Sequence, residues 1–372
     1  MNTTDHLPVA GRVMSLDVMR GLIMLLLCAE SCMLYIALQN FDLPAPFSSV
    51  VNQFFHHPWN GLRFWDLVQP AFMLMAGAAL YISYSRKLLK GVSWRQNFRH
   101  IASRSLKLFI CGVALHCVYA GKPVFELWNV LTQLAVTTLI AYLIIEWSYK
   151  SQIIASIFIL LLTELAYRFI LIPGYNQPFV QSLNLGSYVD TLLMGKINSD
   201  GWVAINAIPT AVHTIWGVLA GKLLVSGQSN TSKIKYLVIA GIAGLLIGYG
   251  LDLLHITPII KRISTSSFAF ASAGWVLLML TAVYWLVDVR QNSKYAWVFT
   301  VMGMNAIFIY LFFETVGMEW LDKTIAIFTG DLLHMCFGLT SNWAALISAL
   351  AVLFFEWALC YWLYKKKIFF KL

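Results

Sequence analysis

One short polar stretch stands out in this otherwise apolar chain: FFHHPWNGLRFWDLVQP, residues 54 to 70. It places two histidines, an asparagine, an arginine and an aspartate just ahead of a long apolar run. An imidazole has an unperturbed pKa of about 6.5, so it can accept and return a proton at physiological pH. His56 and His57 are therefore candidates for proton transfer, although the spacing alone also allows ordinary surface histidines.

The residues around the two histidines indicate a fixed frame. Pro58, Trp59 and Gly61 predict a turn that is anchored at a membrane interface. Asp66 opens the helix that follows, where a carboxylate is stabilised by the helix N-terminus and can orient an imidazole. Zinc needs three or four converging ligands, and the sequence does not supply such a set around the histidines, so we predict no metal.

The first apolar segment also contains ionisable residues, which are expensive within a bilayer and need a partner or a cavity. Asp17 and Arg20, in SLDVMRG, are three residues apart on one helix face and can neutralise each other near the cytoplasmic boundary. Glu30 has no basic residue within four positions in its own helix. We therefore expect it to find a partner in the following connection, from His56, His57 or Arg63.

The composition defines the class of protein. Of 372 residues, 59% are hydrophobic and 12% are charged, about half of the usual charged fraction of about 25%. A spanning helix needs about 20 apolar residues. We predict an all-α polytopic membrane protein with about ten transmembrane helices, near residues 14–38, 64–86, 100–121, 125–147, 151–173, 204–226, 234–254, 267–288, 296–316 and 342–365. An eleventh span at 318–340 would have to include Asp322, Lys323 and Asp331.

Basic residues predict the orientation, because positively charged loops stay in the cytoplasm. The connection from Arg86 to Lys107 contains seven of them, and Lys365 to Lys367 form a cluster near the C-terminus. An even number of spans puts both groups and both termini on the cytoplasmic side. The histidine stretch and the connection 174–203 are then on the outer face, where that connection can cap a site.

The basic cytoplasmic loops account for most of the net charge of +9, and attraction of these loops to anionic lipid headgroups is the companion explanation. We therefore predict no nucleic-acid partner. We find no internal repeat and no soluble domain. The organisation expected is a single transmembrane domain, residues 1–372.

Five blocks of the sequence carry a family resemblance. They are SLDVMRG (15–21), HHPWNGLRFWDLVQPAFMLMAG (56–77), TSSFAFASAG (265–274), GMNAIFIYLFFE (303–314) and the terminal YWLYKKKIFFKL. Together they resemble, in family order, the heparan-alpha-glucosaminide N-acetyltransferase family, and most closely its bacterial branch. The resemblance implies an integral protein of the bacterial inner (plasma) membrane, multi-pass, and a homodimer.

The resemblance also implies an activity: transfer of an acetyl group from cytoplasmic acetyl-CoA to an amino sugar or related glycan on the far side of the membrane. The catalytic histidine of the family matches His56, and Asn305 and Glu314 match polar positions of its late GMN helix. The chain departs from the family around Glu30 and Ser31, where an asparagine is expected, and at Thr132 and Gln133, where a Gln-Arg pair is expected.

These considerations lead to an assignment of roles for an acyl-CoA-dependent N- or O-acyltransferase. His56 is the general base for the acceptor or itself accepts the acetyl group, and Asp66 or Glu30 orients it. Asn60, Asn305 and Glu314 contact the substrate or the developing oxyanion. Asp17, Arg20 and Lys222 contact the coenzyme, for whose phosphates the Arg86–Lys107 segment is an alternative.

Two other classes of function remain open on the sequence. A secondary transporter for a sugar or sugar derivative also fits ten helices with buried carboxylates and an outer vestibule. A non-catalytic relative that binds CoA or lipid is the third reading. Ion-coupled uptake without acyl-CoA would identify a transporter, and acyl-CoA consumption that requires His56 would identify an enzyme.

Overall fold

The computed structural model describes residues 13–370, and these residues form helices and loops with one isolated β-bridge, between Ile172 and Tyr175. The α-helices are α1 (Met14–Ser31), α2 (Leu34–Gln39), α3 (Phe47–Asn52), α4 (Val68–Leu89), α5 (Trp94–Ala120), α6 (Val130–Leu143), α7 (Tyr149–Phe169), α8 (Leu185–Met194), α9 (Ala207–Val225), α10 (Asn230–Leu253), α11 (Ser266–Tyr284), α12 (Ala296–Met304), α13 (Ala306–Phe312), α14 (Asp322–Ala326), α15 (Leu332–Phe337) and α16 (Ser341–Lys365). Short 3₁₀ turns, η1 (Phe64–Leu67) and η2 (Ala204–Asn206), precede α4 and α9, and π-helical turns form η3 (Trp285–Val289), η4 (Phe313–Leu321) and η5 (Ile327–Asp331).

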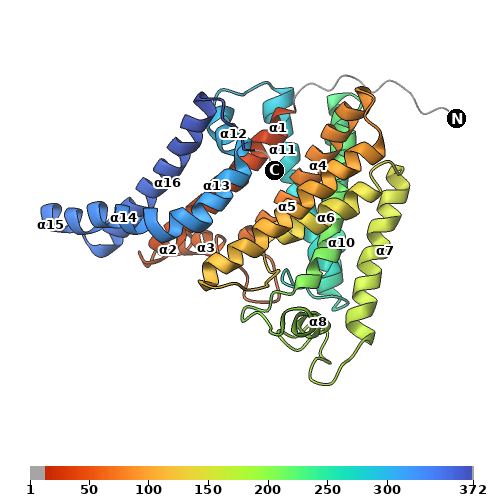
Figure 1. Ribbon diagram of the computed structural model, residues 1–372, viewed down its shortest axis with the longest axis horizontal. Coiled ribbons are helices and arrows are strands. Elements are labelled where there is room, and N and C mark those ends of the chain that lie inside the picture. The colour runs from red at the N-terminus through yellow and green to blue at the C-terminus, as the bar shows by residue number, and fades with distance from the viewer. Residues whose placement is uncertain (1–12, 371–372) are drawn as a thin grey trace.

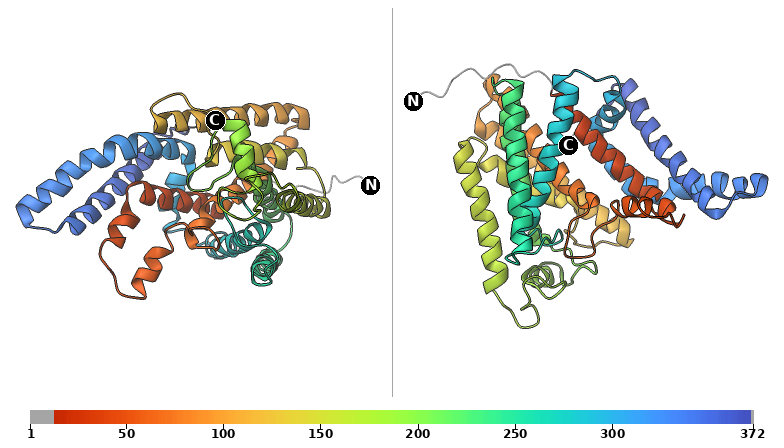
Figure 2. Two further views of the ribbon diagram at one scale, coloured as in Figure 1. Left: turned by 90° about the horizontal axis from the view of Figure 1, so that it is seen from below. Right: turned by 180° about the vertical axis from the view of Figure 1, so that it is seen from behind.

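The long helices pack as neighbouring pairs, namely α10 with α11, α4 with α9, α1 with α12 and α5 with α6 (Figure 1). Side chains of α1, α4, α9 and α11 meet in the largest apolar core, where Met19, Met24, Met73 and Leu74 are fully buried. The run from α13 to α15 projects away from this bundle and returns through α16, as both views in Figure 2 show. The core therefore holds α1 and α4 rigidly, and these helices line the cavities described below.

Helix ends follow local sequence signals. Ser93 caps α5 through the backbone N–H of Gln96, and Thr265 caps α11 through that of Phe268. Gly121 and Gly195 end α5 and α8 in the left-handed conformation that glycine adopts without strain.

The number of spans expected from the sequence is not confirmed. Among residues 13–370, seven helices are long and apolar enough to cross a membrane, or up to eight if the bent pair 296–304 and 306–337 is one span. The helix α1 has 18 residues but contains Asp17, Arg20 and Glu30, and α6 has only 14 residues. By length and composition, these two segments are not among the seven, so their membrane spans and the count of about ten stay predictions.

The stretch 318–340 is likewise not a separate apolar helix. It continues the helical run 306–337, which is bent by 74° from α12 at Asn305. The π-helical turns lie within this run. The expected eleventh span is therefore part of the element that follows α12.

The segments expected on the outer face gather at one end of the molecule. The connection 174–203, which contains α8, lies at the bottom of Figure 1, and the α4–α5 connection lies at the top. Trp59 Nε1 donates to the carbonyl oxygen of Phe179 at 2.7 Å, so the histidine stretch contacts this connection. The sidedness itself stays a prediction, and the terminal residues 1–12 and 371–372 are outside the described part of the chain.

Glycines allow a close helix contact between α4 and α9. A Cβ at Gly77 would stand 2.0 Å from the carbonyl oxygen of Thr214, and one at Gly217 would stand 2.1 Å from that of Leu74. Small residues of this kind let helix backbones approach in membranes.

We expect Gly217→Leu to force α4 and α9 apart and to destabilise the protein by about 1–3 kcal/mol or more. Thermal unfolding in detergent micelles measures this as a lower midpoint. Gly250→Ala is the control, since no atom lies within 4 Å of a Cβ at Gly250. Equal midpoints for the two variants would contradict the close packing of α4 on α9.

Candidate active site

His56 is held by the carboxylate of Asp66. The Nδ1 atom of His56 lies 2.9 Å from Asp66 Oδ1, and Asp66 is buried in η1, directly before α4. The other carboxylate oxygen, Oδ2, accepts hydrogen bonds from the backbone N–H groups of Arg63 (2.9 Å) and His57 (3.2 Å). The Asp66 side chain therefore has two roles: one carboxylate oxygen orients the imidazole, and the other accepts hydrogen bonds from backbone N–H groups at the start of the helix.

Lys261 completes this group from a distant part of the chain. Its Nζ lies 3.2 Å from His56 Nδ1 and 3.6 Å from Asp66 Oδ1, and the side chain is 7% exposed. The loop that carries it is fastened to the histidine stretch, since Gly61 N donates to Ile259 O at 2.8 Å. The indole ring of Trp202 lies over the ammonium group, 5.4 Å from Nζ to the ring centroid.

The tautomer of His56 follows from these contacts. A carboxylate oxygen 2.9 Å from Nδ1 requires a proton between the two atoms, so Nδ1 is the donor. The lone pair of Nε2 is then available to accept a proton. His57, by contrast, does not line the cavity, and its ring packs against Gly61.

Burial and the nearby Lys261 cation lower the pKa of His56 to about 4, although Asp66 acts in the opposite direction. Burial likewise lowers the pKa of Lys261 to about 8, against the opposing effect of Asp66 and Glu30. At neutral pH the imidazole is therefore neutral and able to accept a proton.

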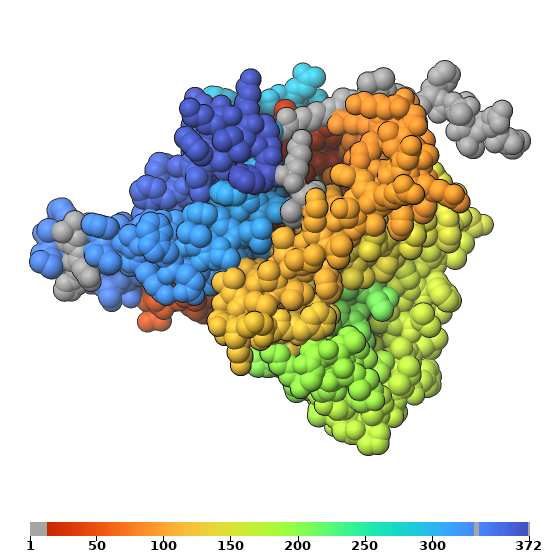
Figure 3. Space-filling model, in the orientation of Figure 1, coloured from red at the N-terminus to blue at the C-terminus, as the bar shows by residue number. Residues whose placement is uncertain are grey.

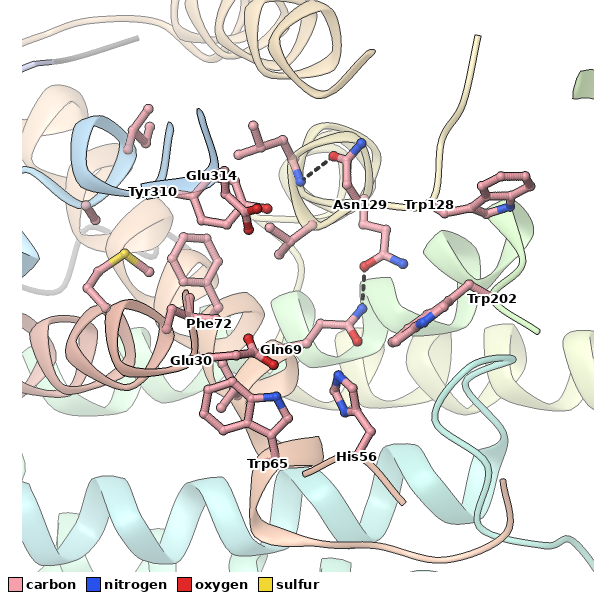
Figure 4. Close-up of a pocket in the computed structure, with 18 of the residues that line it drawn as sticks. Glu30, His56, Trp65, Gln69, Phe72, Trp128, Asn129, Trp202, Tyr310 and Glu314 are labelled. Atoms are coloured by element: carbon pink, nitrogen blue, oxygen red, sulfur yellow. Dashed lines mark hydrogen bonds between the residues drawn. The ribbon is translucent and has the colours of Figure 1, made fainter. Parts of the chain in front are cut away.

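His56 faces a cavity of about 280 Å³. The lining comes mainly from α1, α4, α5, α6, α13 and η4, with Trp202 and Lys261 from two loops. Figure 4 labels Glu30, His56, Trp65, Gln69, Phe72, Trp128, Asn129, Trp202, Tyr310 and Glu314. Figure 3 shows α5 lying against the 306–337 run on this face of the molecule. Tyr119 on α5 donates to Glu314 across that contact.

Two carboxylates that the sequence analysis named, those of Glu30 and Glu314, line the cavity. Glu30 lies in the last turn of α1, and Figure 4 shows it beside Trp65 and Gln69. Glu314 lies at the start of η4, next to Tyr310. His116 also lines the cavity and pairs with Glu126, 3.0 Å from Nδ1 to Oε2.

The two asparagines proposed for the oxyanion are not brought to this cavity. Asn60 is exposed in the loop after the histidines. Asn305 is fully buried at the α12–α13 bend, where Nδ2 donates to Ile368 O (3.1 Å) and Oδ1 accepts from Phe370 N (3.0 Å). Its amide therefore fastens the C-terminal segment.

A second cavity, of about 630 Å³, lies further along the same helices. It contains Asp17 and Arg20, joined by an ion pair of 2.8 Å, together with Arg86, Lys87 and Lys90. Lys222, the third residue assigned to the coenzyme, lies elsewhere: Nζ donates to Trp147 O at 2.8 Å and stands over the rings of Tyr81 and Tyr149.

Sequence reasoning did not identify Lys261, Gln69, His116 or Trp202. Lys261 is next to Arg262 in an outer connection, and there it counts only as one of the basic residues that set the orientation. Its distance of 205 residues from His56 leaves no local signal for the pairing. Among the described residues, no group of three or more His, Cys, Asp or Glu side chains could hold a metal ion.

Comparison with known proteins adds a family. A family model described as heparan-alpha-glucosaminide N-acetyltransferase, catalytic, matches residues 12–256. The human protein heparan-alpha-glucosaminide N-acetyltransferase (Homo sapiens) is 24% identical over 387 residues, which cover 86% of this chain. The alignment covers 56% of the human protein, so the chain spans little more than half of that relative. His56, Asp66 and Gln69 fall within the matched region, and Lys261 and Glu314 follow it.

Proposed function

Because the chain belongs to the heparan-alpha-glucosaminide N-acetyltransferase family, we propose that it is a membrane-embedded acyltransferase that uses acetyl-CoA. The acetyl group passes from the cytoplasmic side to an amino sugar or related glycan on the outer face. The observation that carries the proposal is His56, a neutral imidazole in the wall of a cavity, held between Asp66 and Lys261.

In the direct reaction the acceptor nitrogen or oxygen attacks the thioester carbonyl carbon. The proton of the attacking N–H or O–H passes to His56 Nε2, and the C–S bond breaks. The imidazolium then returns the proton to the CoA thiolate, which leaves as the thiol. In the covalent alternative, His56 Nε2 attacks the thioester carbonyl carbon and the C–S bond breaks to release the CoA thiolate. The acceptor then attacks the acetyl-imidazole, the bond from the acetyl carbon to Nε2 breaks, and the proton of the acceptor passes to the thiolate.

The arrangement of the two cavities supports acetyl-CoA as the donor. Both cavities lie along α1 and α4, with Arg20 in one and Glu30 in the other. Ten residues of helix rise by about 15 Å, which is the length scale of an extended pantetheine arm. The second cavity, called the basic cavity below, is lined by Arg20, Arg86, Lys87 and Lys90 and suits the phosphates of CoA. The thioester of a coenzyme bound there then reaches toward His56.

The first experiment offers acetyl-CoA and glucosamine to the purified protein in detergent. We expect saturable acetyl-CoA binding and release of free CoA with N-acetylglucosamine as the product. A folded protein that binds no acyl-CoA, but takes up a sugar into vesicles with an ion gradient, would overturn the acyltransferase in favour of a transporter.

A second expected outcome concerns the basic cavity. The double variant Arg86→Gln, Lys90→Gln should raise the Kd for acetyl-CoA about tenfold or more at low salt, because charged contacts to phosphate are lost. Isothermal titration measures the Kd, and S-acetylpantetheine, which lacks the phosphates of CoA, should bind the variant and the parent equally.

The matched control for this variant is Lys235→Gln, Lys294→Gln, which removes two basic residues that do not line the cavity. If the control weakens acetyl-CoA binding as much as the cavity variant does, the effect is one of general charge and the coenzyme is not held there.

A further inference from the structure

A second histidine–carboxylate pair contributes to the cavity that His56 lines. The Nδ1 atom of His116, on α5, lies 3.0 Å from Glu126 Oε2, and Lys196, from the loop after α8, pairs with the other oxygen of that carboxylate. The Lys196 ammonium lies over the Trp128 indole, 5.7 Å from the ring centroid. The set repeats the arrangement around His56: a carboxylate at Nδ1, a lysine at that carboxylate and an indole at the ammonium group.

The contact with Glu126 fixes the tautomer of His116. A carboxylate oxygen 3.0 Å from Nδ1 makes Nδ1 the donor, so the lone pair of the neutral imidazole is at Nε2. Within residues 13–370 this Nε2 atom is buried and has no hydrogen-bond partner. A buried acceptor without a partner is unfavourable. Because His116 lines the cavity, a bound molecule can supply the missing donor.

The two imidazoles lie on different walls of the cavity. His116 packs edge to face against Trp128, with 6.5 Å between the ring centroids, and His56 packs at the same separation against Trp65. Figure 4 shows Trp128 and Trp65 on opposite sides of the cavity. A molecule bound in the cavity is therefore within reach of two imidazole lone pairs.

The proposed reaction requires a second base. The pKa of an α-amino group is about 7.7–8.0, so an amino sugar with an amine of this kind is mostly protonated at pH 6.5. Its ammonium has no lone pair and cannot attack a carbonyl carbon until it loses one proton. His56 takes the further proton of the attacking amine in the direct reaction, and it carries the acetyl group in the covalent alternative. In both routes the first proton needs another acceptor.

His116 suits this proton better than the carboxylates of the cavity do. The ordinary pKa of histidine is about 6.5 and that of glutamate about 4.3, so the imidazole matches an amine more closely. Glu314 already accepts from Tyr119. Among the described residues, the charged groups that face His116 are Glu126 and Lys196. Lys196 is 48% exposed and screened by solvent, whereas Glu126 is 13% exposed and favours the imidazolium.

We propose that His116 is a second catalytic base, whose Nε2 takes one proton from the ammonium of the acceptor and holds it while the freed amine attacks. The N–H bond breaks and its electron pair stays on the nitrogen atom. The amine then reacts as described above, and its further proton ends on the CoA thiol. After the product leaves, the His116 imidazolium releases the first proton to water. Ammonium and acetyl-CoA thus give the acetamide, the CoA thiol and one proton. This inference rests on the proposed function.

The test is the pH dependence of kcat/KM for glucosamine, from pH 6 to 9, in the parent and in His116→Asn, each as the purified full chain in detergent. A proton held on His116 keeps the protonated acceptor reactive, so the parent should change little below the pKa of the amine. In His116→Asn only the free amine reacts, so kcat/KM falls about tenfold per pH unit below about pH 7.7. We expect a deficit of about tenfold at pH 6.5 and of less than about twofold at pH 9.

The choice of variant separates catalysis from structure. The amide N–H of an asparagine can still donate to Glu126, but nothing replaces Nε2. A purely structural role of His116 therefore predicts a parental pH profile for His116→Asn, or an equal loss at pH 6.5 and pH 9 with a lower thermal unfolding midpoint. Either result would overturn the proposal. His255→Gln is the control, since His255 is exposed after α10 and does not line the cavity, and it should follow the parent at every pH.

The two proposals fail in different ways. If the parent neither binds nor consumes acetyl-CoA, the acyltransferase proposal fails and this inference fails with it. If acetyl transfer occurs and His116→Asn keeps the parental pH profile, the function stands and the assignment of His116 fails. Transfer to a hydroxyl of glucose but not to glucosamine would also exclude the second base, because a neutral hydroxyl has no extra proton to lose before it attacks.

Discussion

Replacing His56 by alanine should abolish acetyl transfer while leaving acetyl-CoA bound. General acid–base catalysis by a positioned side chain contributes about 10²- to 10⁴-fold, and we expect kcat to fall by that factor. The coenzyme contacts assigned to the basic cavity do not involve His56, so its Kd should stay within about twofold, well below the tenfold that 1.4 kcal/mol represents. Release of free CoA and isothermal titration measure the two quantities on the same preparation.

His57→Ala is the matched control for this experiment. The side chain of His57 is adjacent in sequence but packs against Gly61 outside the cavity lining, and its contact with Asp66 is made by the backbone. We expect near-normal transfer from this variant. If His57→Ala and His56→Ala lose activity equally, the assignment of the base to His56 is wrong.

Removing the charge of Lys261 should shift the pH dependence of transfer. Burial and the Lys261 cation hold the pKa of His56 at about 4, so the base is neutral down to about pH 5. In Lys261→Met the cation is gone and Asp66 still favours the imidazolium, so the pKa rises toward its ordinary value of about 6.5. The acid limb of kcat/KM therefore moves to higher pH.

The size of the effect depends on the assay pH. Below the new pKa, the neutral fraction of His56 falls about tenfold per pH unit, so most of the loss appears between about pH 5 and 6.5 and little at pH 8. Measuring kcat/KM from pH 5 to 9 checks this. Lys261→Arg keeps the charge and should restore the acid limb toward that of the parent.

A uniform loss of activity at every pH would contradict an electrostatic role for Lys261 and would indicate a structural one. Thermal unfolding of both variants separates these cases. Lys261→Met leaves the buried Asp66 carboxylate with one cation fewer, so a structural role appears as a lower unfolding midpoint.

How far sequence reasoning reached depends on the range of each interaction. His56 and Asp66 are ten residues apart, so the sequence could name Asp66, with Glu30 as the alternative, as the carboxylate that orients the imidazole, and the structure shows the contact with Asp66. Glu30 was recognised as an ionisable residue in an apolar segment and Glu314 through the family resemblance, and both line the cavity. Asn60 was chosen by residue type and Asn305 by residue type together with the family resemblance, and neither shows whether an amide already bonds to the backbone, as that of Asn305 does.

The number of spans shows the same limit. Hydropathy found every apolar segment, but it did not detect that α6 has only 14 residues or that the chain bends by 74° at Asn305. Both features depend on how neighbouring helices satisfy or interrupt the backbone hydrogen bonds of the segment. A hydropathy window contains only the segment itself and therefore carries no information about those neighbours.

The sequence by itself therefore determined the helical membrane class and the family, and it narrowed the carboxylate that orients His56 to Asp66 or Glu30, because these rest on composition and on short motifs. Only the tertiary structure decided that Lys261, 205 residues from His56, lies beside both the His56 imidazole and the Asp66 carboxylate. A buried charge or amide needs a partner, and that partner comes from any part of the chain that packs beside it. When the partner lies in a loop far away in the sequence, the local sequence does not reveal the contact.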